Sequence, residues 1–206
     1  MGSEISTMTT TMRFLRGENQ RLQQLNEELQ EENSYLRECF KSLRGLQRAV
    51  SRLDAHVQLK ALLDRIIYEA LRIVDAAEGS LSLIDESKQE LVFVVVRGTL
   101  CEQLQGHRIP LRDGIVGWVI AHGEPEIVND ISQDDRFSPL VDVTFDFRTR
   151  SLISVPLISR GKVLGAIEVV NKFSGRPFDE KDLEMLSMLA LIAARAIDLA
   201  GFKGRN

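Results

Sequence analysis

Residues 150–182 read RSLISVPLISRGKVLGAIEVVNKFSGRPFDEKD and contain the strongest local signals in the chain. Two runs rich in β-branched residues, 150–159 and 163–171, are separated by a short Arg-Gly-Lys turn, which predicts a β-hairpin. A Ser-Gly pair at 174–175 marks a second turn, and an acidic segment with Asp179 as a candidate N-cap follows it. The stretch therefore predicts two antiparallel strands followed directly by a helix.

The sequence on either side of this hairpin predicts the rest of an α+β domain. Strands are expected at 80–85, 90–98 and 107–111, an extended piece at 124–130, and helices at 59–74, 114–123 and 179–200. The segment 131–147 has no steady period, and a long irregular segment in a compact domain is usually a binding loop or lid. Hairpin-joined strands bracketed by helices predict an antiparallel sheet flanked by helices, with one core within 58–200.

The N-terminal part carries a seven-residue repeat over 12–43, and the spacing of its apolar residues changes beyond it. Leucines occupy one column, and three consecutive asparagines occupy the column three residues earlier. A buried Asn at such a position lowers stability but fixes register, so 12–57 is expected to form a parallel homodimeric coiled coil with a stutter. The alternative is a charged helix lying on its own domain. The residues expected to dimerise are Leu15, Asn19, Leu22, Asn26, Leu29, Asn33, Leu36 and Leu43.

Composition excludes several classes of protein. The net charge of −4 provides no basic field for nucleic acid. Cys39 and Cys101 lie far apart, which fits neither a disulfide framework nor a metal site and indicates a reducing compartment. No apolar run reaches the roughly 18–20 residues that span a bilayer. We therefore expect a cytoplasmic protein, with no nucleic acid, membrane or metal partner, a disordered or tag-like segment at 1–11 and a short tail at 201–206.

Three stretches together resemble a known family. GIVGWVIAHGEPEIVNDISQDDRFSP (114–139), FDFRTRSLISVPLISRGKVLGAIEVVNK (145–172) and FDEKD (178–182) resemble a GAF domain of the cyclic-nucleotide phosphodiesterase and bacterial sensor type. The resemblance covers roughly 55–200 and implies a six-stranded antiparallel sheet. It implies terminal helices on one face that form a dimer, and a small-molecule pocket on the other. Such domains regulate an attached output module and do no chemistry themselves.

Four residues match that family's Asn-Lys, Phe, Asp-Glu motif in order, while the motif's final Glu falls on Leu183. The resemblance implies a salt bridge between the motif's Lys and Asp that supports the pocket and contacts no ligand. The four motif residues are Asn171, Lys172, Phe178 and Asp182.

Candidate ligand contacts come from the same resemblance and from side-chain chemistry. Thr149 and Glu168 fall where cyclic-nucleotide-binding members place pocket residues, and Ile131 and Phe137 fall in the loop that walls the pocket. Trp118, the only Trp, is either core or a wall that stacks a planar ligand. Arg136 beside such a pocket would meet an anionic ring ligand. This chain departs from the family at two positions. Phe145 stands where cyclic-nucleotide-binding members have a small hydroxyl residue, and Asp146 stands where many of them have Gly.

A catalytic role is not indicated, because the three His residues are scattered and Cys101 has no neighbouring His. The sequence therefore predicts a dimeric regulatory domain that binds a small molecule, with a cyclic nucleotide as the ligand class that the resemblance implies. It would pass the signal through its coil and terminal helices to a signalling output protein. The alternative is a dimerisation scaffold without a ligand, which Phe145 and Phe147 near the expected pocket favour.

Overall fold

The structure, a computed structural model, describes residues 2–50 and 56–201, apart from the side chains of several residues within 2–58. The chain divides into two units, residues 1–43 and 44–206, and each is described by itself. None of the described helices combines the length and the apolar character that crossing a membrane requires.

Helix α1 (Gly2–Val50) contains the heptad repeat. It begins at Gly2, so residues 2–11, expected to be disordered or tag-like, are helical in the structure. These residues contain no Pro, and a helix that is already nucleated propagates by one hydrogen bond per residue. The expected coil boundary at 57 falls in a second helix, α2 (His56–Val74), and the connection at 51–55 lies outside the described residues.

The heptad leucines of α1 are exposed in the single chain. Leu15, Leu22 and Leu29 are 57%, 54% and 50% exposed. The three heptad asparagines are exposed as well, and Leu43 is half-buried, whereas the side chain of Leu36 lies outside the described residues. The dimer predicted from this stripe therefore stays a prediction.

Six strands form one antiparallel sheet in the order β3-β2-β1-β6-β5-β4. The expected fold class is confirmed. The first strand begins earlier than the sequence pattern indicated, because Ala76 and Gly79 pair with Lys172 and Val169 of the long strand β6. The strands are β1 (Ala76–Asp85), β2 (Glu90–Arg97), β3 (Arg108–Pro110), β4 (Glu126–Val128), β5 (Leu152–Ser159) and β6 (Lys162–Lys172).

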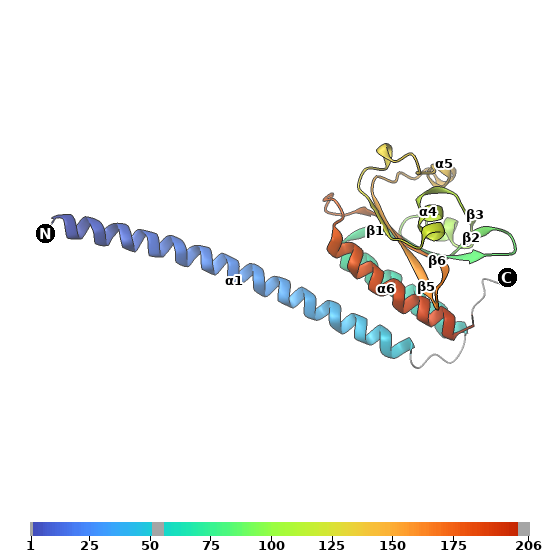
Figure 1. The fold of residues 1–206 in the computed structure, drawn as a ribbon, viewed down its shortest axis with the longest axis horizontal. Coiled ribbons are helices and arrows are strands. Elements are labelled where there is room, and N and C mark those ends of the chain that lie inside the picture. Colours follow the sequence, from blue (N-terminus) through green and yellow to red (C-terminus); the bar gives the residue numbers. More distant parts are fainter. Residues whose placement is uncertain (1, 51–55, 202–206) are drawn as a thin grey trace. The chain divides into compact units, whose positions relative to one another are not determined.

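Helices cover both faces of the sheet (Figure 1). Helices α2 and α6 (Glu180–Leu199) pack together on one face, and α4 (Gly114–His122) and α5 (Leu140–Phe145) lie on the other. Successive side chains of a strand alternate between faces, so β6 directs Ile167 and Val169 toward α2 and α6. The same alternation leaves Glu168 on the opposite face, beneath α4 and α5.

The junction between β6 and α6 explains much of the stretch 171–182. Asp179 is the N-cap of α6, as predicted: its side chain accepts a hydrogen bond from the Asp182 N–H, and Asp182 accepts one from the Asp179 N–H. This capping box satisfies two backbone donors that a helix start leaves without partners.

Short helical turns were not predicted by the sequence pattern. The segment 131–147 contains the 3-10 turn η1 (Ile131–Gln133) and helix α5, and α3 (Cys101–Leu104) follows β2. Helices of one or two turns are too short to show an apolar period, so their positions depend on tertiary contacts.

Candidate functional site

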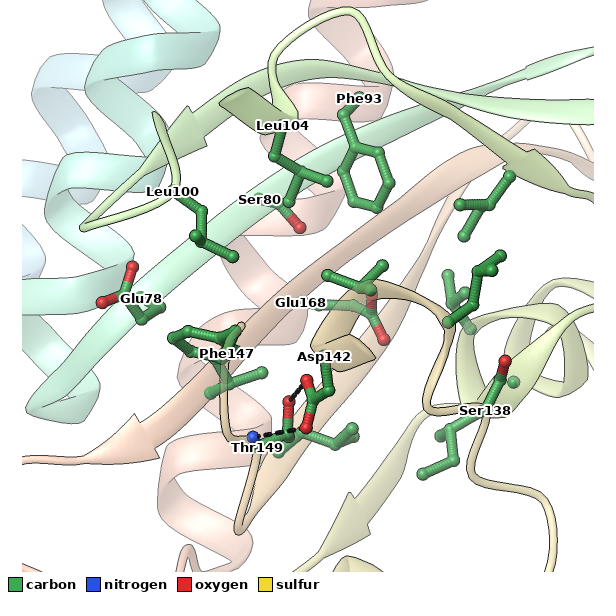
Figure 2. Close-up of a pocket in the computed structure, with 18 of the residues that line it drawn as sticks. Glu78, Ser80, Phe93, Leu100, Leu104, Ser138, Asp142, Phe147, Thr149 and Glu168 are labelled. Carbon is green, nitrogen blue, oxygen red and sulfur yellow. Dashed lines mark hydrogen bonds between the residues drawn. The ribbon is translucent and has the colours of Figure 1, made fainter. Parts of the chain in front are cut away.

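A cavity of about 120 Å³ lies between the sheet and the segment 137–149. Strands β1, β2 and β6 form its floor, and α3, the start of α4 and the segment 137–149 form its walls. Figure 2 shows the side chains of these elements converging on it. Its walls are largely apolar, which is typical of small-molecule sites. The apolar lining includes Phe93, Val96, Leu100, Leu104, Ile109 and Phe147.

Glu168 of β6 supplies the central polar group of the floor (Figure 2). The strand register places Ser80 of β1 on one side of it and Ser154 of β5 on the other. Burial raises the pKa of Glu168 to about 7, and the Ser154 hydroxyl opposes that shift. Ser154 Oγ lies outside hydrogen-bond geometry with Glu168 and has no partner among the described residues, although Ser154 is fully buried.

Two further carboxylates at the cavity are held by threonines. Glu78 accepts hydrogen bonds from the backbone N–H and hydroxyl of Thr99, at 2.8 and 3.0 Å. Asp142 accepts bonds from the backbone N–H and hydroxyl of Thr149, at 2.8 and 2.7 Å. Gly98 leaves room for the first pair: its φ is +118°, and a Cβ there would lie 1.6 Å from Glu78 Oε2.

The segment 137–149 closes over the cavity through α5. Phe147 N–H donates to the Asp142 carbonyl at 3.0 Å, just after the left-handed Asp146, whose φ is +50°. A residue in the left-handed conformation after a helix is most often Gly. This conformation at position 146 accounts for the Gly that the family resemblance implies there. Asp is among the few other residues that tolerate this conformation.

Arg97 connects the cavity wall to α2. Its guanidinium donates from Nε to Asp64 Oδ1 at 3.0 Å and from Nη2 to Oδ2 at 2.6 Å. The same group lies 5.2 Å from the centroid of the Tyr68 ring on α2. Both charges of the ion pair are half-exposed, so the pair orients the two elements more than it stabilises the fold.

The comparisons with known proteins give this fold a family. A family model described as GAF domain matches residues 58–197. The chain belongs to the GAF domain family. The structure confirms the six-stranded antiparallel sheet and the flanking helices that the resemblance to this family implies.

Curated relatives of this GAF chain include cyclic-nucleotide phosphodiesterases. The dual 3',5'-cyclic-AMP and -GMP phosphodiesterase 11A of Takifugu rubripes is 33% identical over 161 residues, which cover 73% of this chain and 18% of that protein. The dual 3',5'-cyclic-AMP and -GMP phosphodiesterase 11 of Drosophila melanogaster is 32% identical over 145 residues, covering 64% and 10%. The chain thus spans less than a fifth of the length of these two relatives.

Solved structures show the same fold in bacterial proteins. The GAF domain from a phosphoenolpyruvate-protein phosphotransferase of Coxiella burnetii has a TM-score of 0.69 and 21% identity, covering 81% of this chain and 96% of that chain. The free methionine-R-sulfoxide reductase from Neisseria meningitidis has a TM-score of 0.63 and 23% identity, covering 79% and 90%. At these identities the likeness concerns the fold alone.

Three of the six candidate ligand contacts line the cavity of this GAF domain: Phe137, Thr149 and Glu168. Thr149 lines the cavity while its neighbours Arg148 and Arg150 are exposed, although β5 begins only at Leu152.

The other three candidates lie elsewhere. Ile131 is buried in a separate apolar cluster with Val119 and Leu152. Trp118 stacks on His122 at 4.1 Å between ring centroids, beside an outer groove. It lies two residues after Val116 in α4, and side chains two apart in a helix point to roughly opposite sides.

Arg136 lies 4.8 Å from the Trp118 ring centroid. Its guanidinium is held by Asp134 and Glu126, at 2.8 and 2.9 Å, which leaves it directed away from the cavity. Trp118, Ile131 and Arg136 therefore lie outside the lining of this cavity.

None of the four motif residues lines the cavity. Lys172 Nζ forms the expected ion pair with Asp182, with both side chains nearly buried. Asn171, whose φ is +60°, ties β6 to the end of the segment 137–149, because its side chain accepts from Arg150 N–H and donates to Arg148 O. Phe178 is buried, and its backbone pairs with the Asn129 side chain at 2.7 and 3.0 Å.

Sequence reasoning missed Ser80, Glu78 and Asp142 as part of the cavity lining, and it missed Ser154 as a neighbour of Glu168. A signal was present in the run SLSLID, where serines alternate with leucines and so share one face of a strand. The sequence does not say which face of the sheet these serines occupy. The strand register was needed to show that Ser80 pairs with Glu168 of the neighbouring strand.

Proposed function

We propose that this GAF domain is a regulatory sensor that binds a small molecule in the cavity and responds as a dimer. The observation that carries the proposal is the cavity itself: apolar walls surround the half-buried carboxyl of Glu168. The one cationic side chain of the described lining, Arg97, pairs with Asp64. A small number of polar groups in an apolar cavity is the usual design of a ligand site. The domain is proposed to regulate and not to catalyse.

Ligand binding would act first on the segment 137–149. This segment supplies Phe137, Asp142, Phe147 and Thr149 to the cavity, while no residue of α5 is buried. A segment with few buried side chains opens at low free-energy cost, so contacts with a ligand would favour its closed form.

Transmission would then run through Arg97. Its side chain lines the cavity and holds Asp64 of α2. Helix α2 packs on α6, so a change at Arg97 would bias both terminal helices of the domain. A coupling of this kind is a free energy shared by two sites, and it acts equally in both directions.

The dimer would form through α1. The exposed leucines at 15, 22 and 29 lie in one column, and the asparagines at 19, 26 and 33 in the column beside it. This arrangement favours a coiled coil of two parallel helices, because each buried Asn loses its partner when the register changes. The partner in the cell would be a second copy of this chain together with a signalling output protein, in the cytoplasm, where cysteines stay reduced.

A cyclic nucleotide is the ligand class that the likeness to phosphodiesterases suggests. A thermal-shift screen of cyclic nucleotides and small metabolites tests the sensor proposal, because a ligand that binds the folded state raises its unfolding midpoint. Mass spectrometry of small molecules retained by the purified chain is the complementary test. A chain that retains nothing and responds to no compound would contradict a sensor function.

The second candidate is a dimerisation scaffold without a ligand. It is favoured by the size of the cavity, about 120 Å³, since ligand pockets usually measure about 300–1,000 Å³. Phe147 fills part of this space (Figure 2), whereas Phe145 packs against His107 instead. Replacing Phe147 with Ala would leave dimerisation unchanged under both functions, but it would change ligand response only under the first.

A further inference from the structure

The charge of the cavity lining identifies a class of ligand. The described lining contains the carboxyl groups of Glu78, Asp113, Asp142 and Glu168 and one guanidinium, that of Arg97. Arg97 makes a bidentate pair with Asp64, outside the cavity, so its charge is largely neutralised before a ligand enters. A phosphate entering this space would meet carboxylates and no uncommitted cation of the lining.

The start of α4 does not reverse this balance. The N-terminus of a helix carries a partial positive charge, and Gly114, Ile115 and Val116 bring it to the cavity. Asp113 lies at the same helix start, where its carboxylate complements that charge. The lining as a whole therefore favours positive charge.

The floor supplies a position for a positive group. Glu168 lies between Ser80 and Ser154 across three adjacent strands. Ser154 is fully buried and its Oγ has no partner among the described residues. A carboxylate in an apolar cavity is costly unless a partner donates hydrogen bonds to it. Ser80 and Glu168 line the cavity and Ser154 lies outside the lining, so an ammonium or amidinium group would donate its N–H groups to Glu168 and to the Ser80 hydroxyl.

Resting on the sensor function proposed above, we propose that the cavity binds a small cationic ligand, an amine or amidine attached to a single ring or a short hydrocarbon. Its cationic group lies against Glu168 with Ser80 beside it, and its apolar part contacts Phe93, Val96 and Leu104. The size of the cavity, about 120 Å³, suits one ring and not a nucleotide.

Benzamidinium and benzoate are suitable probes because they have nearly the same shape and opposite charge. We expect the full chain to bind benzamidinium in titration calorimetry and to bind neither benzoate nor cyclic GMP measurably. Glu168→Gln keeps the shape of the side chain and removes its charge, and should weaken benzamidinium binding about tenfold or more. Glu124→Gln, at an exposed position outside the lining, is the matched control and should leave binding unchanged.

The pH dependence gives a second readout. Glu168 shares the cavity lining with Glu78 and Ser80 from β1, Arg97 from β2, Asp113 at the N-cap of α4 and Asp142 from α5, and its neighbour on β5 is Ser154. A pKa of about 7 for Glu168 means that a cation must displace a proton at low pH. Benzamidinium should therefore bind about tenfold more weakly at pH 6 than at pH 8, and this dependence should vanish in Glu168→Gln.

Each outcome is distinct. Tighter binding of benzoate or cyclic GMP than of benzamidinium overturns the cationic ligand while the sensor function stands. The same holds if mass spectrometry finds an anionic molecule retained by the chain. If no probe binds and no molecule is retained, both proposals fall. If Glu168→Gln does not fold, Ser80→Ala replaces it, and unchanged benzamidinium affinity in that variant overturns the proposed position of the ligand.

Discussion

Arg97 of β2 and Asp64 of α2 join the cavity wall to a terminal helix through two hydrogen bonds of 3.0 and 2.6 Å. The two residues are 33 positions apart in the chain, so the contact depends on the tertiary fold. It connects a residue of the cavity lining directly to α2. Its contribution to the free energy of unfolding is small, because half-exposed ion pairs contribute about 0–1 kcal/mol.

Replacing Arg97 with Met should separate binding from transmission. We expect ligand affinity to change by less than about threefold, since the guanidinium faces Asp64 and not the ligand. The ligand-induced change in hydrogen exchange of α2 should be lost. Arg176→Met, at an exposed position, is the control and should retain it. A full response of α2 in Arg97→Met would contradict this route.

Lys172 should matter for stability before it matters for binding. Lys172→Met leaves Asp182 with its charge nearly buried and one partner fewer, which should cost about 2–4 kcal/mol in urea unfolding. Lys162→Met, at an exposed position of the same strand, should cost less than about 0.5 kcal/mol. Loss of ligand binding with unchanged stability would show that Lys172 acts on the ligand and not as a support.

Glu168 should make stability depend on pH. Burial raises its pKa in the folded state to about 7, above the ordinary glutamate value of 4.5, so between these pH values the folded chain holds more protons than the unfolded chain. Stability therefore falls as pH rises through this window and levels off above it, by about 3 kcal/mol at most.

Glu168→Gln lacks this titration. Its free energy of unfolding should exceed that of the parent increasingly from pH 4.5 to pH 8, by up to about 3 kcal/mol. Glu124→Gln should run parallel to the parent. An identical pH profile for Glu168→Gln and the parent would mean that the carboxyl is solvated in the folded state.

The asparagine column of α1 should set the oligomeric state. Replacing Asn19, Asn26 and Asn33 with Leu should raise the melting temperature of the coil and broaden the assembly from dimers to larger oligomers, measured by analytical ultracentrifugation. Gln24→Ala, at an exposed position outside the column, should leave a dimer. A parent chain that sediments as a monomer at micromolar concentration would contradict the coiled coil.

The hairpins and the main helices were predictable because each is long enough to show the apolar period of its type. The Asp179 cap was predictable because a turn and an acidic segment surround it. Helix α5 was not, since six residues show no period and its end depends on Asp146 in the left-handed conformation. The helical start at Gly2 was also missed, because the Ser and Thr residues of 3–11 have weak helix propensity.

The cavity was predictable only in part. Glu168 was identified from the family resemblance, while Ser80 and Ser154 became neighbours of it only through the strand register. Trp118 and Arg136 were misplaced because composition alone does not say which side of α4 faces the sheet, and Arg136 has acidic partners at 134 and 126.

The central claim, that a small molecule in the cavity biases the dimer, is tested most directly by inter-subunit distances. A spin label at Gln24→Cys, with Cys39 and Cys101 replaced by Ser, reports the separation of the two copies of α1 by pulsed electron resonance. We predict that the compound with the largest thermal shift, at saturation, changes the distance distribution. A distribution that stays the same with the cavity saturated would contradict the account.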